Sequence, residues 1–382
     1  MHRRNFLKIA GSTAVIVAAG GAGFVATRTP TAALKPWKTA GSVYPDPLRR
    51  ALSYAILAPN PHNRQPWIIG LKGETEAVVT CDLERLLPQT DPFGRQIVIG
   101  LGCFLELFSI AASDQGFRAE IRYFPEGQPD QMLDRRPIAH LSLSKQPGLV
   151  ADPLFVHTLS RHTNRTPYDT DRAVGDDLLR RLRDAPAGSP HIGTANRGTL
   201  LQDLRNLTAG AMLAEMQNPE ANRESIDLMR IGRAEIETNP DGISLGGAFL
   251  EALSMAGVLT RKSLADPASR SYRIALDMIE EAAMATMGFV WINTIGNDRA
   301  AQIDAGRAYL RVALQATADQ LAMQPMSQAL QEYAAMAPYF QTLHDRLTSR
   351  PGERVQMLAR LGYANQVGPA PRWPLKTRLR ES

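Results

Sequence analysis

The sequence contains little cysteine, and this shortage limits the kinds of site that it can build. Cys81 and Cys103 are its only two cysteines in 382 residues, and neither belongs to a CxxC pair. Two isolated cysteines cannot form a CxxC redox site or a cysteine-rich zinc site. If the chain is exported, the sequence would still allow one disulfide between them. His157 and His162 are five positions apart, which is poor spacing for a shared metal on a helix. We therefore expect no metal site.

Signatures of other protein classes are also missing. There is no HExxH zinc motif and no GxxxxGK[ST] phosphate-binding loop. The sequence Gly100-Leu101-Gly102 lacks the third glycine of a dinucleotide-binding turn. The net charge of +5 comes from arginines scattered through the chain, which favours a solvated basic surface over a nucleic-acid partner. With 44% apolar and 21% charged residues, the composition is that of a globular protein.

The N-terminus carries a targeting signal. Arg3 and Arg4 are followed by Phe-Leu-Lys and by a run of small and apolar residues from Ile9 to Ala26. A charged stretch before a short apolar run is typical of a targeting segment, and the paired arginines resemble a twin-arginine export signal. We expect a periplasmic or exported protein, with residues 1–40 as a signal. This signal is either cleaved, for example near Thr31-Ala32-Ala33, or kept as a membrane anchor.

The rest of the chain predicts an α+β fold with a more helical second half. In the first half, periodicity predicts helices at 47–57 and 94–112 and strands at 68–71, 77–81, 118–124 and 138–143. In the second half, it predicts helices at 176–183, 200–216, 223–237 and 298–321, and a helix or a helix plus a strand at 274–291. The first half is therefore expected to place a central apolar helix on an antiparallel sheet.

The two longest predicted helices share a sequence pattern. One reads GCFLELFSIAASDQ from Gly102, and the other reads GRAYLRVALQATADQL from Gly306, an offset of 204 to 205 residues. In each, a glycine precedes an apolar face, small residues and Asp-Gln. This repetition suggests two related halves, which we place at 41–150 and 151–382.

Two short segments resemble motifs of one flavoprotein family. Residues 58–67 read APNPHNRQPW and resemble the APSxxNxQPW segment of the nitroreductase superfamily, with Asn60 in place of the usual serine. Residues 161–168 read RHTNRTPY and resemble the family's basic R-x-S/T-x-R/K segment. Members of this superfamily bind FMN, usually as homodimers with each flavin at the subunit interface. One subunit supplies the basic segment, and the other supplies the proline–asparagine loop.

Here each motif occurs once, and the two motifs lie in different halves. This arrangement, with the export signal, resembles the fused, internally duplicated Acg-like branch of the superfamily. The resemblance implies a nitroreductase-like fold in which two related halves of one chain mimic the homodimer, each with a central helix and an antiparallel sheet. It also implies one composite FMN site per chain.

The resemblance assigns roles to particular residues. On the phosphate of FMN it places Arg161, Thr163 and Arg165, and it also places there Arg372, because PAPRWPL resembles the family's C-terminal arginine segment. A stiff wall beside the flavin is expected from Pro59, Asn60 and Pro61, with Asn63 as a hydrogen-bonding partner. His162 is expected near the ring, and the backbone N–H groups of Ser327 or Gln328 are expected at flavin N5. Trp67 is interpreted as a core anchor.

These assignments favour an exported FMN flavoprotein that passes two electrons to a small acceptor, such as a quinone or nitroaromatic. The flavin carries this chemistry, so no catalytic side chain is assigned, and the electron donor stays open. An FMN-sequestering or storage protein with little or no turnover is the alternative, and a structural protein with an inactive flavin site is a third. The poorly matched segment 239–271 is interpreted as a lid over the flavin.

Overall fold

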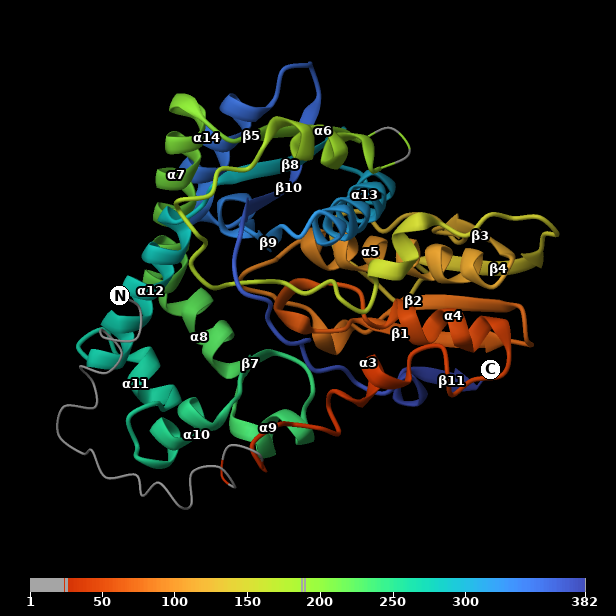
Figure 1. The fold of residues 1–382 in the computed structure, drawn as a ribbon, viewed down its shortest axis with the longest axis horizontal. Helices are drawn as coiled ribbons and strands as arrows, with labels where there is room; N and C mark the ends of the chain where they lie inside the picture. Colours follow the sequence, from red (N-terminus) through yellow and green to blue (C-terminus); the bar gives the residue numbers. More distant parts are fainter. Residues whose placement is uncertain (1–23, 25–26, 187, 189, 382) are drawn as a thin grey trace.

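The computed structural model describes residues 24, 27–186, 188 and 190–381. Arg3, Arg4 and nearly all of the apolar run that follows them lie outside the described residues, so the export signal stays a prediction. Within the described part, the chain forms a mixed α+β structure with two main sheets and a pair of long helices between them (Figure 1). The expected α+β fold class is confirmed at this level.

The first sheet is built almost entirely by the first half of the chain. Its strand order is β11-β1-β2-β4-β3, with β1 (Trp67–Lys72), β2 (Glu76–Cys81), β3 (Phe117–Tyr123), β4 (Ala139–Lys145) and β11 (Leu379–Glu381). Neighbouring strands are antiparallel except for β11, which pairs with β1 in parallel and comes from the C-terminus. Alternating burial along β2 and β4 fits a sheet with one face in the core and one face toward solvent.

The second sheet has the same strand order and direction as the corresponding strands of the first. It runs β5-β8-β10-β9, with β5 (His191–Ala195), β8 (Gly288–Ile295), β9 (Ala322–Pro325) and β10 (Glu353–Gly362), all antiparallel. In the first sheet β2 leads into the long helix α5 (Arg95–Asp114), which is followed by the edge strand β3; in the second sheet β8 leads into α13 (Arg299–Ala318), which is followed by the edge strand β9. Strands β5, β9, β10 and β11 were not expected from the sequence.

The two long helices form the centre of the molecule. Helices α5 (Arg95–Asp114) and α13 (Arg299–Ala318) each contain 20 residues and begin 204 positions apart. They cross at Gly102 and Gly306, where an added Cβ would overlap the Ile303 and Ile99 carbonyl oxygens, respectively. Glycine is therefore required on both helices for this close approach. One hydrophobic core surrounds the crossing and takes buried residues from both halves.

The other helices cover the sheets and build an additional region. They are α3 (Lys35–Thr39), α4 (Pro47–Ala55), α6 (Asp176–Asp184), α7 (Gly198–Gln217), α8 (Pro219–Asp227), α9 (Gly232–Thr238), α10 (Ala248–Met255), α11 (Arg261–Ala265), α12 (Arg270–Met284) and α14 (Ala337–Leu347). Figure 1 shows α8 to α11 as a projection at the lower left. A two-stranded sheet of β6 (Met229–Ile231) and β7 (Ile243–Leu245) lies within this region.

One predicted helix differs from the structure, and one prediction that left two alternatives is decided by it. The single helix expected at 223–237 is wrong, because β6 separates α8 from α9 and Gly232 adopts a left-handed φ of 78°. At 274–291 the helix-plus-strand alternative holds, as α12 ends at Met284 and β8 begins at Gly288.

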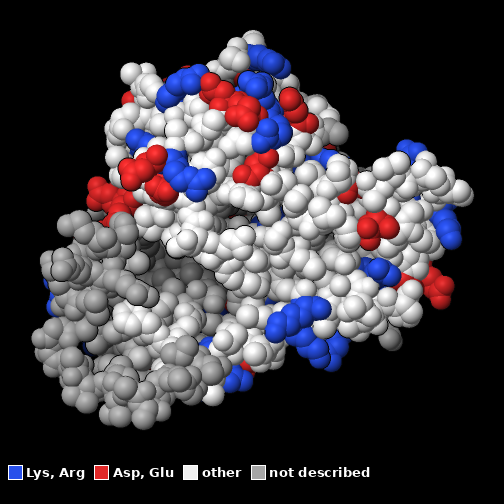
Figure 2. Space-filling model, in the orientation of Figure 1, with Lys and Arg blue, Asp and Glu red and all other residues white. Residues whose placement is uncertain are grey.

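Neither the distribution of charge nor the hydropathy of the helices indicates a nucleic-acid-binding surface or a membrane-spanning helix in the described part of the chain. Acidic and basic side chains are interspersed on the face shown in Figure 2, without a continuous basic stripe. Helix α5 is long and apolar enough to cross a membrane, but 83% of its most apolar window is buried inside the protein. A core helix of a globular protein has these same properties, so α5 is weak evidence for a membrane span.

Candidate cofactor site

The proline–asparagine loop has an unusual backbone. It follows α4 and contains a short 3-10 helix, η1 (Pro61–Asn63), and three of its residues have left-handed φ angles, namely His62 at 44°, Asn63 at 52° and Gln65 at 52°. The Asn60 side chain spans the loop, because its Oδ1 accepts from Gln65 N at 2.7 Å and its Nδ2 donates to Ala58 O at 3.1 Å. Asn60, which replaces the usual serine, thus stabilises the loop from inside.

The C-terminal segment fixes this loop from one side. Asn63 Nδ2 donates to Pro371 O at 3.0 Å, and Arg372 Nη1 donates to Asn63 Oδ1 at 2.7 Å. The Nη2 group of Arg372 donates to two carbonyls where the loop begins, Leu57 O at 3.0 Å and Ala58 O at 3.1 Å. Burial and the neighbouring Arg161 charge lower the pKa of Arg372 to about 9. Arg372 therefore acts here as a clamp on the loop, and its contact with a phosphate stays a prediction.

The basic segment lies against the same loop. Arg161 is only 5% exposed, and its Nη2 donates to Leu57 O at 3.3 Å. Arg165 is exposed, and the surrounding protein still lowers its pKa by desolvation. Desolvation also lowers the pKa of Arg161. Tyrosine and cysteine side chains offset these shifts in part, and no carboxylate contributes.

A histidine of the loop connects the two motifs electrostatically. Burial lowers the pKa of His62 to about 4, with further lowering by the positive charges of Arg165 and Arg64. Arg165 comes from the basic segment, so that segment and the loop face each other closely enough for their charges to interact. His62 is consequently neutral at neutral pH, and its buried Nδ1 has no hydrogen-bond partner among the described residues.

His162 and Thr163 complete the basic segment. His162 Nδ1 lies 2.7 Å from Val367 O, and its ring meets the Trp37 ring edge-on at a centroid distance of 5.3 Å. Its buried Nε2 has no partner in the described part of the chain. Thr163 is half-buried. His162 is thus held by protein contacts on one side and keeps one free ring nitrogen.

The turn expected at flavin N5 follows β9. A 3-10 helix, η4 (Ser327–Leu330), begins there with no side-chain cap, which leaves the first N–H groups available, as expected from the sequence. The basic segment runs beside β9, since Asn164 N donates to Met323 O at 3.1 Å. No hydrogen bond joins Ser327 or Gln328 to the other motif residues within the described ranges. Gln328 instead hydrogen-bonds to the buried Glu215, whose pKa is raised by burial.

The arrangement fits a phosphate-bearing ligand. Arg161 is a buried cation with no carboxylate partner among the described residues, and such a charge is costly unless an anion compensates it; the exposed Arg165 adds a second positive charge in the same segment. The adjacent His162 Nε2 and His62 Nδ1 are buried polar atoms that lack partners among the described residues. Arg161, Thr163 and Arg165 would hold a phosphate group, and Asn60 and Pro61 would flank the group attached to it.

Several residues at this site were missed by the sequence reasoning. Gln65 is fully buried and is satisfied by segments far away in the sequence: its Nε2 donates to Pro240 O at 2.7 Å, and Trp373 N donates to its Oε1 at 2.9 Å. Asp241 and Arg64 form an ion pair beside it at 3.2 Å. Only the QPW match pointed to Gln65, and no local signal could have identified Asp241.

One enzyme-like pattern was also missed. Residues 242–246 read Gly-Ile-Ser-Leu-Gly, which matches GxSxG. In a nucleophile elbow the serine occupies a strand-to-helix turn, whereas Ser244 is the middle residue of the short strand β7. The pattern therefore does not form a nucleophile elbow.

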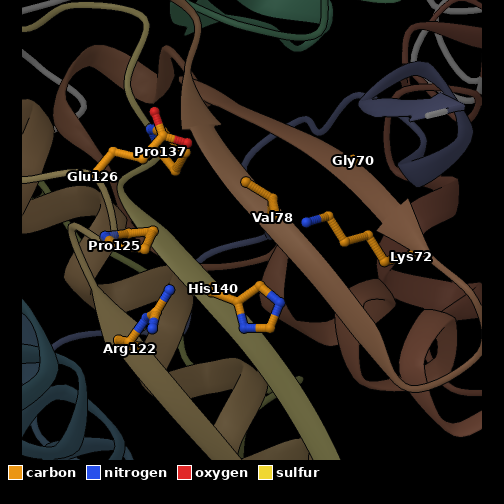
Figure 3. Close-up of a pocket in the computed structure, with 8 residues that line it drawn as sticks. All are labelled: Gly70, Lys72, Val78, Arg122, Pro125, Glu126, Pro137 and His140. Atoms are coloured by element: carbon orange, nitrogen blue, oxygen red, sulfur yellow. The ribbon is translucent and has the colours of Figure 1, made fainter.

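Two surface hollows lie away from the motif residues. One, of about 360 Å³, occupies the outer face of the first sheet, where Gly70, Val78, His140 and Arg122 form one row across neighbouring strands (Figure 3). Gly70, the β1 member of this row, has no side chain, and this leaves space beside Val78. The other, of about 390 Å³, lies near the N-termini of α5 and α13. Neither contains a residue assigned to FMN.

The cysteines and possible metal ligands give no alternative centre in the described part of the chain. Cys81 and Cys103 are both buried and unpaired, and burial raises the pKa of each thiol to about 12. Such thiols are unreactive near neutral pH. No group of three or more potential His, Cys, Asp or Glu ligands occurs among the residues that the structure describes.

Comparison with known proteins supports the resemblance given by the motifs. No protein-family model matches the chain. The chain is 27% identical over 340 residues to a putative NAD(P)H nitroreductase of Mycobacterium tuberculosis, covering 85% of this chain and 88% of that protein. It is 33% identical over 129 residues to an uncharacterized protein of the same organism. This alignment covers 32% of the chain and spans only about a third of that relative, 36% of its length.

Solved structures give weaker similarities. A putative nitroreductase from Anabaena variabilis matches with a TM-score of 0.44 and 11% identity, covering 81% of this chain and 82% of that chain. A similarity of this size carries no argument about cofactor or activity. The sequence relative that covers most of the chain thus provides the support for the nitroreductase superfamily.

Proposed function

We propose that the chain is an FMN-binding oxidoreductase of the nitroreductase superfamily, with two related halves that form one composite site. The observation that carries this proposal is the buried guanidinium of Arg161, which is 5% exposed, lies against the proline–asparagine loop at Leu57 O (3.3 Å) and has no carboxylate partner among the described residues. The equal strand order of the two sheets and the glycine crossing of α5 and α13 support an internal duplication. The name of the M. tuberculosis relative supports the reaction class.

Each residue of the site has a distinct task in this proposal. Arg161, Thr163 and Arg165 bind the phosphate, and Arg372 holds the loop in place through Asn63 and the carbonyls of Leu57 and Ala58. The backbone N–H groups of Ser327 or Gln328, at a helix start without a side-chain cap, would donate to the flavin ring at N5. When bound, FMN supplies two-electron transfer to a small acceptor, for which we propose a quinone or nitroaromatic. The residues of the chain bind and orient the flavin and exclude water.

The cellular context is part of the proposal. Arg3, Arg4 and the following apolar run would direct the folded, flavin-loaded chain through the twin-arginine route to the periplasm or beyond. We expect NAD(P)H to be scarce there, so the physiological electron donor is a different reductant. The Acg-like assignment and the domain limits at residues 40 and 150 stay predictions.

Anaerobic stopped-flow spectroscopy tests the reaction. Flavin-loaded protein reduced with one equivalent of dithionite is mixed with a quinone or a nitroaromatic, and the visible absorbance of the oxidised flavin is followed. We expect reoxidation by the acceptor, and slow or absent bleaching when oxidised protein is mixed with NADPH. A flavin that stays reduced with all acceptors would contradict an oxidoreductase and favour FMN sequestration. Rapid stoichiometric bleaching by NADPH would restore an NAD(P)H-dependent reaction.

A further inference from the structure

One carboxylate joins the additional region to the proline–asparagine loop. Asp241 is 6% exposed, and its Oδ2 accepts from Arg64 Nη1 at 3.2 Å and from Arg85 Nη1 at 2.6 Å, while its Oδ1 accepts from Arg230 Nη2 at 3.1 Å. The three arginines come from the loop itself, from the short 3-10 helix η2 (Leu83–Arg85) and from β6. A single side chain therefore ties together three segments that are far apart in the sequence.

Backbone contacts on both sides of Asp241 reach the same loop. Pro240 O accepts from Gln65 Nε2 at 2.7 Å, and Gly242 N donates to Asn63 O at 3.3 Å. At Gly242 the φ angle is +75°, and an added Cβ would overlap Leu228 O. Only glycine therefore lets residues 240–242 lie along the loop while keeping this path. We call residues 240–242 the strap.

The loop needs such external contacts because its conformation is intrinsically unfavourable. His62, Asn63 and Gln65 all have left-handed φ angles, which non-glycine residues keep only when surrounding contacts enforce them. The C-terminal segment provides one set through Arg372, and the strap provides the other. The Asp241 carboxylate neutralises three arginines that would otherwise repel one another, namely Arg64, Arg85 and Arg230. Asp82 also pairs with Arg85, so it would compensate only part of the charge that remained.

We propose that Asp241 is a positioning residue for the flavin site: through the strap it holds the loop in the conformation that places Asn60 and Pro61 beside the flavin. The effect of Asp241 on the loop follows from the contacts alone. Its effect on flavin binding rests on the proposed function. It also limits the predicted lid, because any opening of 239–271 has to occur beyond Gly242.

Hydrogen–deuterium exchange and flavin titration test the inference together on the full chain. Asp241→Asn removes the charge, Asp241→Glu keeps it, and Asp227→Asn is the matched control, since Asp227 forms an exposed ion pair with Arg223 in the same region. In Asp241→Asn we expect exchange of a peptide covering residues 60–66 to be at least about 10-fold faster than in wild type. FMN and riboflavin binding should weaken by similar factors, also about 10-fold, because the loop contacts the part that both ligands share. The Asp241→Glu and Asp227→Asn variants should stay within about 3-fold of wild type.

Unchanged exchange of the loop in Asp241→Asn, together with unchanged binding, would overturn the inference. If Asp241→Asn does not fold, Gly242→Ala replaces it, because its Cβ displaces the strap from Leu228 without removing a charge. The same faster exchange at 60–66 is then expected, and unchanged exchange is again contradictory. If wild type binds neither flavin, the proposed function fails, whereas the exchange measurement still decides the role of Asp241.

Discussion

Replacing Arg161 with methionine separates a phosphate-binding role from a structural one. Arg161→Met removes the charge and keeps an unbranched side chain about as long as the aliphatic part of arginine. Within the described part of the chain the guanidinium makes one hydrogen bond of 3.3 Å, to Leu57 O, and no carboxylate there compensates its burial. The substitution should therefore cost the flavin-free protein little, and it can stabilise that protein, because it removes an unpaired buried charge.

The expected loss appears only with a phosphorylated ligand. Charge-assisted hydrogen bonds contribute about 1.5–3 kcal/mol, which corresponds to a 10- to 150-fold change in Kd. FMN affinity should fall by that factor, whereas riboflavin affinity should change by less than about 3-fold, because riboflavin lacks the dianion. Isothermal titration of both ligands and thermal unfolding of the flavin-free protein measure the three quantities. Arg223→Met, at an exposed ion pair with Asp227, is the control.

Two outcomes would refute this reasoning. Equal losses for FMN and riboflavin would mean that Arg161 supports the loop near Leu57 and does not bind the phosphate. A large fall in the melting temperature of the flavin-free variant would mean that the Arg161 charge is compensated within the protein.

The other predictions concern the helix crossing and the loop histidine. Gly306→Ala introduces a Cβ that overlaps Ile99 O, so we expect a loss of about 1–3 kcal/mol in the free energy of unfolding, measured by urea denaturation. The control is Gly368→Ala. Gly368 has open space around it, so this variant should change the free energy of unfolding by less than about 0.5 kcal/mol. A loss as small as the control's would contradict the tight crossing. The pKa of His62 is about 4 in the folded state and lies below its unfolded value, so the unfolded chain binds the extra proton and stability falls as the pH drops from about 6.5 to 4, by at most about 3 kcal/mol. Asparagine tolerates a left-handed φ, so His62→Asn should keep the loop conformation and reduce this pH dependence. Part of the dependence remains, because the pKa of His344 is also lowered to about 4. An unchanged pH profile would show that His62 is not desolvated.

Local periodicity predicted the elements that carry a clear apolar pattern. The two long helices and strands β1 to β4 follow the sequence expectation, because their apolar positions recur at the spacing of their secondary structure. Strand β10 was missed because it carries a charged residue into the core: Arg360 is fully buried and donates to Gln324 Oε1 at 2.7 Å and to the Thr166 carbonyl at 2.8 Å. Such compensation depends on distant residues and leaves no local trace.

The candidate site was predictable only in part, for the same reason. The two motifs revealed the loop and the basic segment, and the structure brings Arg161 to Leu57 O. The clamp by Arg372 and the strap at Asp241 depend mainly on contacts between residues far apart in the sequence, such as Arg85 with Asp241 at 156 positions and Asn63 with Arg372 at 309 positions. Sequence spacing contains no information about such contacts, so their roles became visible only in the folded chain.

The flavin content of the purified chain tests the central claim most directly. Protein is isolated with its flavin, the flavin is released by denaturation and identified by chromatography, and its amount is compared with the amount of chain. Because the basic segment and the proline–asparagine loop each occur once and face each other, we predict one FMN per chain, with Arg161→Met retaining much less. Two flavins per chain, FAD in place of FMN, or no flavin even after incubation with excess FMN would contradict a single composite FMN site.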